Sequence, residues 1–598
     1  MMNFSTLRKN IKKKEFLSRK VNVSLLGDSA TQFLAFAIIG TGVERGFNID
    51  VHEADYNQIE QQICDPSSDF YQYKSEYAIV FQSTHKLLEY YSMMNPTEYT
   101  TLADKRLSFI RTICNNVKQK IIYFNYPEID DAVFGSYANK VIASFPFQVR
   151  KLNFELMKMA QEFDNLFICD IAGIQNTIGR DNMFDVSIYA NTEMIISVQA
   201  LPLVASRVLD IICSIEGQIK KCLIVDLDNT LWGGIVGDDG WENLQIGHGL
   251  GIGKVYTEFQ EWIKKLKNRG IIICVCSKNE EEKAKEPFLY NPEMVLTLDD
   301  ISVFVANWNN KADNIRLIHK ILNIGFDSMV FLDDNPFERN LVKESIPEIT
   351  VPDLPEDPEK YLEYLYSLNL FETASFSNND QDRTKQYQEE AKRVSSLQEY
   401  TNTDDFLKSL NMVSEVSSFT KFNTPRVAQL SQRSNQFNLR TIRYTEDQII
   451  KIEKDTLQQG FAFTLSDRFG DNGLISVVIL KDCDNSEESI PPNLHNMKST
   501  LFIDSWFMSC RVLKRGVENY VLNTIVSWAK RNGYGYLIGE YIPTPKNGLV
   551  ANLYSDMGFE AYVDPDNHCG TQWILNVDDY QERVCYIMTS QTGGTNDD

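Results

Sequence analysis

Two pairs of aspartates each follow directly on an apolar stretch of the chain. Asp226 and Asp228 follow CLIV at the start of DLDNTLWGG, and Asp333 and Asp334 follow MVFL. Short apolar stretches of this kind are typical of buried strands in a parallel sheet. Because the carboxyl ends of parallel strands line the ligand crevice of an open sheet, we expect all four carboxylates to reach one site.

Two more polar residues are placed to reach the same edge. Ser277 ends the apolar run IIICVC, and Lys311 opens the helix-like stretch KADNIRLIHKIL. A hydroxyl can hold a phosphoryl oxygen, and an ammonium group can neutralise phosphate charge. Of the first aspartate pair, one carboxylate can attack phosphorus and the other can protonate the leaving oxygen. The residue types therefore predict phosphoryl transfer through an aspartyl phosphate.

The same carboxylates predict a metal site. Asp226, Asp333 and Asp334 offer oxygen ligands alone. Mg²⁺ prefers carboxylates, carbonyls and water, so Mg²⁺ is the cofactor that this set favours.

This ordered set resembles the haloacid dehalogenase (HAD) superfamily, whose four motifs correspond here to Asp226 with Asp228, Ser277, Lys311, and Asp333 with Asp334. The resemblance implies that Asp226 is the nucleophile. It implies that Asp228 is the general acid and base and a metal ligand through its backbone carbonyl. Asp333 would bind the metal directly and Asp334 through water.

The stretches between the motifs are short. Residues 229–276 and 278–310 cannot hold a separate cap domain, because domains rarely have fewer than about 50 residues. An uncapped site in this superfamily implies a large substrate, or a cover supplied by another domain or protein.

Longer stretches look like the FkbH family of HAD-type proteins (subfamily IIIC), namely DLDNTLWGGIVGDDG, FLDDNPFER, QLSQRSNQFNLRTIRYTEDQI, DRFGDNGLISVVIL and DSWFMSCRVLKRGVE. Proteins of that family remove the phosphates of 1,3-bisphosphoglycerate and pass the glyceryl group to an acyl carrier protein thiol. The resemblance implies such a phosphatase and acyltransferase. The alternatives are a phosphatase of another metabolite, such as a sugar phosphate, fused to an N-acyltransferase, and a non-catalytic scaffold.

The C-terminal region resembles a Gcn5-type (GNAT) acyltransferase. RVLKRG stands where that superfamily has its pyrophosphate loop, before a stretch that predicts a helix, and NGLVANLYSDMGF fits a later motif. Lys514 replaces the first glycine of the loop, which favours a phosphopantetheine arm with one phosphodiester over CoA. The residues that the resemblance implies for binding either group are Arg511, Lys514, Arg515, Gly516, Asn547 and Tyr554.

Cys510 directly precedes this loop. Helix N-termini and neighbouring cations favour a reactive thiolate, so Cys510 is a candidate transient acyl-thioester carrier. The alternative is an inert packed cysteine. Arg511, Lys514 and Arg515 are also predicted to form a cationic patch on which an acidic carrier protein docks.

Near the N-terminus, VSLLGDSATQ is similar to the first block of SGNH hydrolases, with Gly27, Asp28 and Ser29. Such hydrolases need a late histidine that activates the serine. The late segment DVSIY offers Asp185 without that histidine, and Gln82 follows YAIVF in place of an oxyanion-donor motif. We interpret this region as a non-catalytic scaffold.

Alternation of apolar runs with helix-length stretches predicts an α/β multidomain protein. The expected parts are an SGNH-like three-layer α/β domain (1–215), a HAD Rossmann-like parallel sheet with a minimal cap (216–370), a linker and solvated helix (371–400), a GNAT-like α+β domain (401–590) and a disordered tail (591–598). The strand candidates of the second part are CLIV, IIICVC, MVLTL and SMVFL.

Composition limits the partners and the cellular compartment that we expect for the protein. The 598 residues include 82 acidic and 59 basic ones, a net charge of −23 that disfavours nucleic acid as a partner. No apolar run approaches the roughly 20 residues of a membrane span. The 11 cysteines include no CxxC pair, which favours a reducing cytoplasm. Residues 1–20 are basic and amphipathic and predict a docking helix rather than a transit peptide.

Overall fold

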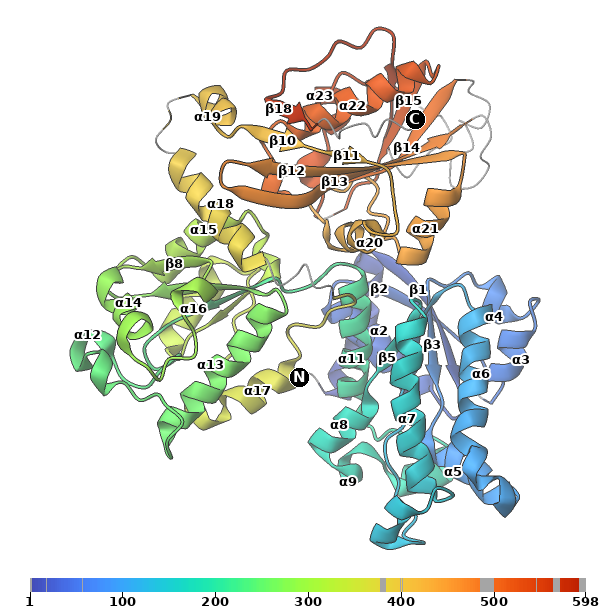
Figure 1. Ribbon diagram of the computed structural model, residues 1–598. Coiled ribbons are helices and arrows are strands. Elements are labelled where there is room, and N and C mark those ends of the chain that lie inside the picture. The colour runs from blue at the N-terminus through green and yellow to red at the C-terminus, as the bar shows by residue number, and fades with distance from the viewer. Residues whose placement is uncertain are drawn as a thin grey trace, which may run out of the picture. The chain divides into compact units, whose positions relative to one another are not determined.

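The computed structural model describes residues 3–17, 19–55, 57–376, 383–397, 400, 402–483, 499–544, 546–562 and 571–590 (Figure 1). The chain forms two compact units, Met1–Ile215 and Glu216–Asp598. No helix within these described residues is long and apolar enough to cross a membrane. The tail 591–598, predicted to be disordered, lies outside them.

The first unit is built on a parallel sheet of order β2-β1-β3-β4-β5. Its strands are β1 (Lys20–Gly27), β2 (Asn48–Glu53), β3 (Tyr77–Phe81), β4 (Lys120–Phe124) and β5 (Leu166–Cys169). This confirms the predicted parallel α/β organisation, although β2 was not among the predicted strands. Its sequence NIDVHE mixes charged and apolar residues, and only Ile49 is fully buried.

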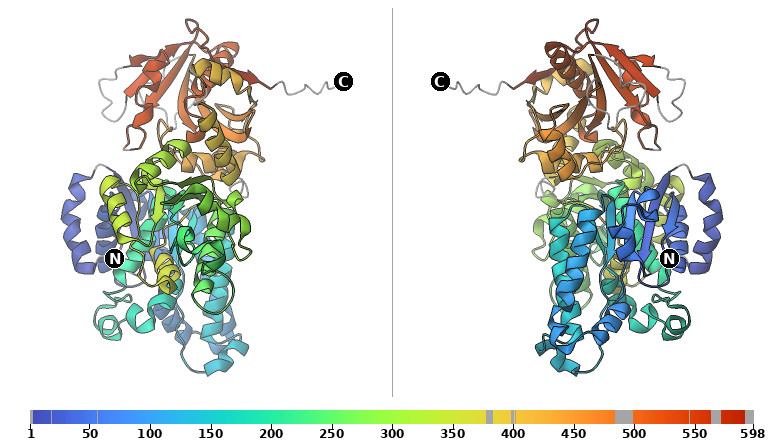
Figure 2. Two further views of the ribbon diagram at one scale, coloured as in Figure 1. Left: turned by 90° about the vertical axis from the view of Figure 1, so that its left-hand side faces the viewer. Right: turned by 90° about the vertical axis from the view of Figure 1, so that its right-hand side faces the viewer.

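Helices cover both faces of this sheet (Figures 1 and 2). On one face lie α2 (Gln32–Glu44) and α11 (Leu201–Ile215), and on the other α6 (Leu102–Asn116) and α7 (Phe145–Glu162). The shorter helices are α1 (Phe4–Asn10), α3 (Ile59–Cys64), α4 (Asp69–Gln72), α5 (Thr84–Met93), α8 (Ile171–Ile178), α9 (Arg180–Met183) and α10 (Val186–Thr192).

The basic N-terminal segment forms α1 and docks on α2. Leu7 of α1 is 1% exposed, and Phe4 stacks on Phe33 with ring centroids 5.2 Å apart. At Gly40 of α2 the two helices approach so closely that a Cβ atom would overlap the Leu7 backbone. Glycine at this position therefore permits the contact.

The second unit begins with a parallel sheet of order β8-β7-β6-β9. Its strands are β6 (Cys222–Val225), β7 (Ile272–Ser277), β8 (Val303–Ala306) and β9 (Met329–Leu332). Its helices are α12 (Val236–Asp239), α13 (Ile252–Asn268), α14 (Glu281–Tyr290), α15 (Lys311–Leu322), α16 (Pro336–Ser345) and α17 (Tyr361–Leu368). Between β6 and α13, α12 and the 3₁₀ turn Trp241–Asn243 are the sole helical elements of a segment that is described throughout.

The predicted strand MVLTL is wrong, because β8 at VFVA takes its place. MVLTL is a loop whose Leu296 is nevertheless fully buried. The Gln260 side chain accepts hydrogen bonds from the backbone N–H groups of Val295 and Leu296, both at 3.1 Å. The Gln260 side chain thus accepts the backbone hydrogen bonds that the carbonyl groups of a neighbouring strand would otherwise accept.

A helix is present within 371–400, as predicted, but it is not a solvated one. Helix α18 (Arg383–Leu397) packs on α15, β7 and β13. Arg393 is 2% exposed, and its guanidinium forms hydrogen bonds of 2.8 and 2.9 Å with both oxygens of Asp467. The polar sequence of α18 reflects buried ion pairs rather than contact with water.

The C-terminal part contains a mixed sheet of order β16-β17-β15-β14-β13-β12-β10-β18, and β11 pairs with β12. Its strands are β10 (Met412–Ser414), β11 (Val416–Ser417), β12 (Gln458–Asp467), β13 (Gly470–Asp482), β14 (Thr500–Met508), β15 (Tyr536–Tyr541), β16 (Glu560–Tyr562), β17 (Thr571–Asn576) and β18 (Ile587–Thr589). Its helices are α19 (Thr403–Ser409), α20 (Thr424–Arg433), α21 (Glu446–Lys454), α22 (Val517–Arg531) and α23 (Leu553–Asp556).

The neighbouring strands β14 and β15 pair in parallel at residues 500–503 and then diverge. The segment 437–439 fills the gap between them. The Leu439 N–H donates to the Trp506 carbonyl at 3.3 Å, and the Ile542 N–H donates to the Leu439 carbonyl at 2.9 Å. The chain's own backbone therefore occupies this opening in the sheet.

We predict that Gly40→Val lowers the free energy of unfolding by about 1–3 kcal/mol, because overpacking would force α1 away from α2. Thermal unfolding of the full chain measures this. Gly249→Val is the matched control, since nothing lies within 4 Å of a Cβ placed there. Equal melting temperatures for the two variants would show that the contact between α1 and α2 contributes no stability.

Candidate active site

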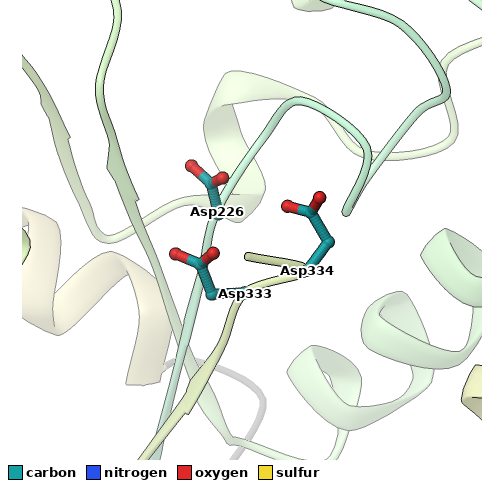
Figure 3. A group of neighbouring side chains, drawn as sticks. All are labelled: Asp226, Asp333 and Asp334. Carbon is teal, nitrogen blue, oxygen red and sulfur yellow. The ribbon is translucent and has the colours of Figure 1, made fainter. Parts of the chain in front are cut away.

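Three carboxylates meet where two neighbouring strands end. β6 and β9 are paired with Val225 opposite Leu332, so the next residues, Asp226 and Asp333, leave the sheet together. The Asp226 N–H donates to the Leu332 carbonyl at 3.0 Å. One oxygen each of Asp226, Asp333 and Asp334 lies within 4.8 Å of the others (Figure 3). The predicted convergence of these side chains is therefore present.

Lys311 enters this group from the first turn of α15. Its Nζ lies 2.5 Å from Asp333 Oδ2 and 3.0 Å from Asp226 Oδ2, and the residue is 3% exposed. Burial lowers the pKa of Lys311, but the two carboxylates raise it by more, so the pKa lies above its usual value. The ammonium group is therefore charged and bridges the two strand ends.

One ammonium group does not balance three carboxylates. Burial, followed by the charge of Asp226, raises the pKa of both Asp333 and Asp334. Asp226 Oδ1 is buried and has no hydrogen-bond partner among the described residues. An orphaned carboxylate oxygen beside two further carboxylates fits a hard divalent cation, and Mg²⁺ suits such a donor set.

Asp228 is not a member of this trio. Its Oδ1 accepts hydrogen bonds from Trp232 Nε1 at 2.9 Å and from the Val236 N–H at 3.0 Å. Its Oδ2 accepts from Asn279 Nδ2 at 2.8 Å, and the same nitrogen donates to Ser277 Oγ at 3.2 Å. Asn279 thus links the two predicted residues. The proposed metal contact of the Asp228 backbone carbonyl stays a prediction.

Sequence reasoning missed three residues that hold the site. They are Asn279, Thr230, whose Oγ1 accepts from the Asp334 N–H at 3.1 Å, and Arg339. Arg339 Nη1 donates to the backbone carbonyls of Asp333 and Asp334 at 2.8 and 2.6 Å. Asn279 lies two residues after Ser277, and Thr230 lies two residues after Asp228. This short separation from predicted site residues is the signal in the sequence that could have identified them.

Comparison with known proteins identifies the family. A model of the FkbH N-terminal domain matches residues 22–213. The solved N-terminal part of the protein BF1531 from Bacteroides fragilis, which contains a phosphatase domain complexed with Mg, is 62% identical and covers 63% of this chain and 100% of that chain, with a TM-score of 0.62. The chain belongs to the FkbH-like family. The curated proteins contain no match to it.

Two acetyltransferase structures are also similar to part of this FkbH-like chain. The ribosomal-protein-S18-alanine N-acetyltransferase from Escherichia coli is 12% identical and covers 29% of this chain and 99% of that chain, with a TM-score of 0.21. The GNAT domain of S. lividans PAT is 14% identical and covers 27% and 89%, with a TM-score of 0.21. Ligand binding by the C-terminal residues is therefore judged from the contacts of those residues.

The predicted cationic patch is wrong for two of its three members. Arg511 is 7% exposed and forms a hydrogen bond with the Gln386 side chain. Arg515 is 6% exposed and pairs with Glu390 and with Asp467, the latter at 3.3 Å. Both guanidinium groups hold α18 and the loop together.

The predicted phosphate loop leads directly into α22. Lys514 is exposed and has a φ of +63°, and Gly516, with a φ of +77°, caps α22. Burial raises the pKa of Glu518, and the backbone N–H groups of Glu518 and Lys514 oppose the rise.

Asn547 and Tyr554 also serve the fold. Asn547 is fully buried, and its Nδ2 donates to the carbonyls of Asn438 at 3.0 Å and Ile542 at 2.9 Å. Tyr554 is 1% exposed and packs so closely on Gly539 that a Cβ there would overlap its ring. Asn547 and Tyr554 are therefore held by contacts within the fold, and the binding of CoA or phosphopantetheine by the predicted set stays a prediction.

Cys510 is not near the carboxylates. Its carbonyl accepts a hydrogen bond of 2.6 Å from Asn323 Nδ2, at the C-cap of α15, whereas Lys311 begins the same helix. At 1.5 Å per residue, the 12 residues of α15 separate these ends by about 18 Å. Cys510 also packs against the apolar core beneath β6 and β7. The structure favours the packed cysteine over the acyl relay.

In the N-terminal domain, Ser29 has no activating base. It is fully buried, and its Oγ has no hydrogen-bond partner in the described chain. His85 packs on Phe184, with ring centroids 4.8 Å apart, and burial lowers its pKa to about 4. Asp185 caps α10 instead of orienting a histidine. The described residues therefore contain no serine hydrolase triad around Ser29. His568 and Cys569, considered as a dyad, lie outside these residues.

We predict that Mg²⁺ raises the melting temperature of the wild-type chain and has a much smaller effect on Asp333→Asn. A ligand at about 100 times its Kd stabilises a protein by roughly 2.7 kcal/mol. Thermal unfolding with Mg²⁺ and with EDTA measures the difference. Asp313→Asn, an exposed carboxylate on α15, should keep the wild-type response. An equal response in Asp333→Asn would place the metal elsewhere.

Proposed function

We propose that this FkbH-like chain is a Mg²⁺-dependent phosphatase that acts on a phosphorylated three-carbon acid such as 1,3-bisphosphoglycerate and loads the acyl group onto an acyl carrier protein thiol. The observation that supports the phosphatase activity is one cluster of side chains, formed by Asp226, Asp333, Asp334 and Lys311. The geometry of a scaffold would not require three carboxylates held together with one unsatisfied oxygen.

The chain's own residues have distinct tasks in removal of the ester phosphate. Asp226 attacks phosphorus through one carboxylate oxygen, so the bond from phosphorus to the substrate alcohol oxygen breaks. Asp228 gives that oxygen its proton. Lys311 neutralises charge on the phosphoryl oxygens, and the Ser277 hydroxyl holds one of these oxygens. Mg²⁺ on Asp226, Asp333 and Asp334 would supply further positive charge, and water then hydrolyses the aspartyl phosphate.

Loading of the carrier uses the other phosphate. The carrier thiolate attacks the carbonyl carbon of the acyl phosphate, a carbon–sulfur bond forms, and the carbon–oxygen bond to phosphate breaks. This direct transfer needs no cysteine of the chain, which agrees with the position of Cys510 at the far end of α15.

The surroundings of the site favour a protein partner. Ile235, Trp308 and Phe337 are 44%, 76% and 68% exposed. Each is close in sequence to a segment that carries a site residue. Ile235 precedes Val236, whose N–H donates to Asp228. Trp308 lies just before α15, and Phe337 is in the first turn of α16. Exposed apolar side chains around a polar site are typical of protein contact surfaces. We assign this rim to the carrier protein.

We predict that Asp226→Asn abolishes phosphate release while the melting temperature stays near that of the wild type. Asp228→Asn should slow hydrolysis of an alkyl phosphate by about 10²–10⁴-fold, the usual value of general acid help. It should affect an acyl phosphate less, because that leaving group needs no proton. Phosphate release from both substrates is measured, with Asp313→Asn as control. Wild-type turnover by Asp226→Asn, or equal losses in Asp228→Asn, would refute these roles.

We predict that the double variant Trp308→Ser/Phe337→Ser loads the carrier about tenfold more slowly, yet hydrolyses a small phosphate ester at the wild-type rate. Cys510→Ala should load the carrier normally. Intact-mass measurement of the carrier over time gives the loading rate. Phe154→Ser, an apolar residue of the N-terminal domain that is 54% exposed, is the control. Loss of loading in Cys510→Ala alone would restore the covalent relay.

A further inference from the structure

An ion pair lies at the edge of the proposed phosphatase site. Lys278 stands between Ser277 and Asn279, directly after β7, and its Nζ donates a hydrogen bond of 2.6 Å to Glu338 Oε1. Glu338 is in the first turn of α16, the helix that follows the aspartates at the end of β9. One pair of charges therefore joins two of the segments that build the site.

This pair spans the end of the strand that carries the nucleophile Asp226. The sheet order β8-β7-β6-β9 places β6 between β7 and β9, so those two strands are two strand spacings apart, about 10 Å. The charges of Asp226, Asp333 and Glu338 all act on the buried thiol of Cys276. The ion pair is therefore gathered around the same strand ends as the carboxylates.

Glu338 is a fixed anion. The residue is 6% exposed, and its Oε2 is buried without a hydrogen-bond partner in the described part of the chain. A carboxylate in the first turn of a helix is stabilised by the N–H groups exposed there, and the Lys278 ammonium group neutralises its charge. Glu338 thus holds the lysine head group in one direction.

Lys278 has more access to solvent than the other cations that contact site residues. Its side chain is 35% exposed, whereas those of Lys311 and Arg339 are 3% and 9% exposed. An ammonium group has three N–H donors. One of them donates to Glu338, and within the described residues no other hydrogen bond of Lys278 Nζ is found. The remaining donors are available at the rim of the site.

The acidic residues that follow Lys278 in the sequence do not occupy these donors. Glu280 and Glu281 are exposed at the start of α14, and Glu281 pairs with Lys285 at 2.5 Å. Among the residues that the structure describes, neither forms an ion pair with Lys278. Charges that are exposed to water interact weakly, so Glu338 is the acid that governs Lys278.

A partly exposed ammonium group beside a phosphoryl site matches a second anionic group on the substrate. A carboxylate or a phosphate can accept a hydrogen bond from Lys278, whereas an ammonium group would be repelled and an alkyl group would gain nothing. Lysine acts as a compact point charge, so it does not distinguish a carboxylate from a phosphate. The geometry therefore selects the sign of the charge rather than one compound.

We propose that Lys278 binds an anionic group of the substrate other than the phosphoryl group that is removed, and that Glu338 is the positioning residue that orients Lys278. This inference rests on the proposed phosphatase function and names the residue that determines its substrate preference. The negative charge of Glu338 weakens the attraction of Lys278 for anions. Loss of the lysine and loss of the glutamate charge should therefore have opposite effects on affinity.

The test uses phosphate esters of one three-carbon chain that differ at the far end, namely propyl phosphate, 3-phosphooxypropionate, propane-1,3-diyl bisphosphate and 3-aminopropyl phosphate. Phosphate release with Mg²⁺ gives KM and kcat for each ester. In the wild type, KM for the carboxylate and bisphosphate esters should be about tenfold lower than for propyl phosphate, and KM for the amine should not be lower.

Variants of the lysine should change this ratio mainly through KM rather than kcat. In Lys278→Met the advantage of the two anionic esters should disappear, and Lys278→Arg should retain most of it. Lys283→Met removes an exposed lysine of α14 that pairs with Glu286 at 2.8 Å, and it should keep the wild-type ratio. An unchanged ratio in Lys278→Met, or a preference of the wild type for the amine, would overturn the proposal.

Glu338→Gln is the independent variant, because glutamine keeps an oxygen that accepts from Lys278 but has no charge. It should lower KM for the carboxylate and bisphosphate esters by about threefold relative to propyl phosphate. A shift in the same direction in Lys278→Met and Glu338→Gln would mean that the pair is only structural. If Lys278→Met does not fold, as judged by its melting temperature, Glu338→Gln and Lys278→Arg decide the question.

Calorimetric titration of Asp226→Asn with the same esters measures affinity without turnover. If the wild type releases no phosphate from any ester, the phosphatase function is refuted, and the order of these affinities still decides the role of Lys278. Equal affinities for propyl phosphate and 3-phosphooxypropionate would overturn the role of Lys278 alone. Absence of binding of every ester would overturn both.

Discussion

The ion pairs of Lys311 with Asp226 and Asp333 are the interaction on which the second unit depends. Parallel pairing of β6 and β9 forces two carboxylates out of the sheet at the same level. Two like charges about 4 Å apart repel by roughly 4 kcal/mol at an effective dielectric constant of 20. The strands can keep this register because α15 delivers an ammonium group between them. The crowding that the lysine only partly relieves is also what suits the site to a divalent cation and a phosphoryl group.

The two ends of α15 contact different parts of the second unit. Its first residue is in the carboxylate site, and its C-cap residue, Asn323, holds the Cys510 carbonyl of the C-terminal part. The C-terminal part is thus anchored at the end of the helix opposite the carboxylates. The buried ion pairs of α18 with Arg515 and Asp467 fix the same arrangement.

The carboxylate site could be predicted because it depends on short-range rules. A strand that ends in aspartate puts the aspartate at the sheet edge, whatever the rest of the chain does. Arg339 could not be predicted, since its contacts with the carbonyls of Asp333 and Asp334 follow from the angle at which α16 leaves the sheet. Arg515 was misread for a related reason. Its partners Glu390 and Asp467 are distant in sequence, and a motif records residue types without their partners.

The same edge of a parallel sheet is used in both units, with opposite treatment of charge. In the second unit the Lys311 ammonium group contacts two of three carboxylates, which outnumber it. In the first unit Asp28 and Arg106 line one cavity without contact. The Asp28 carboxylate accepts a hydrogen bond from the Ser83 N–H, and burial raises the pKa of Asp28 to about 6. The first unit therefore stabilises its aspartate with a backbone donor, whereas the second unit uses a side-chain cation.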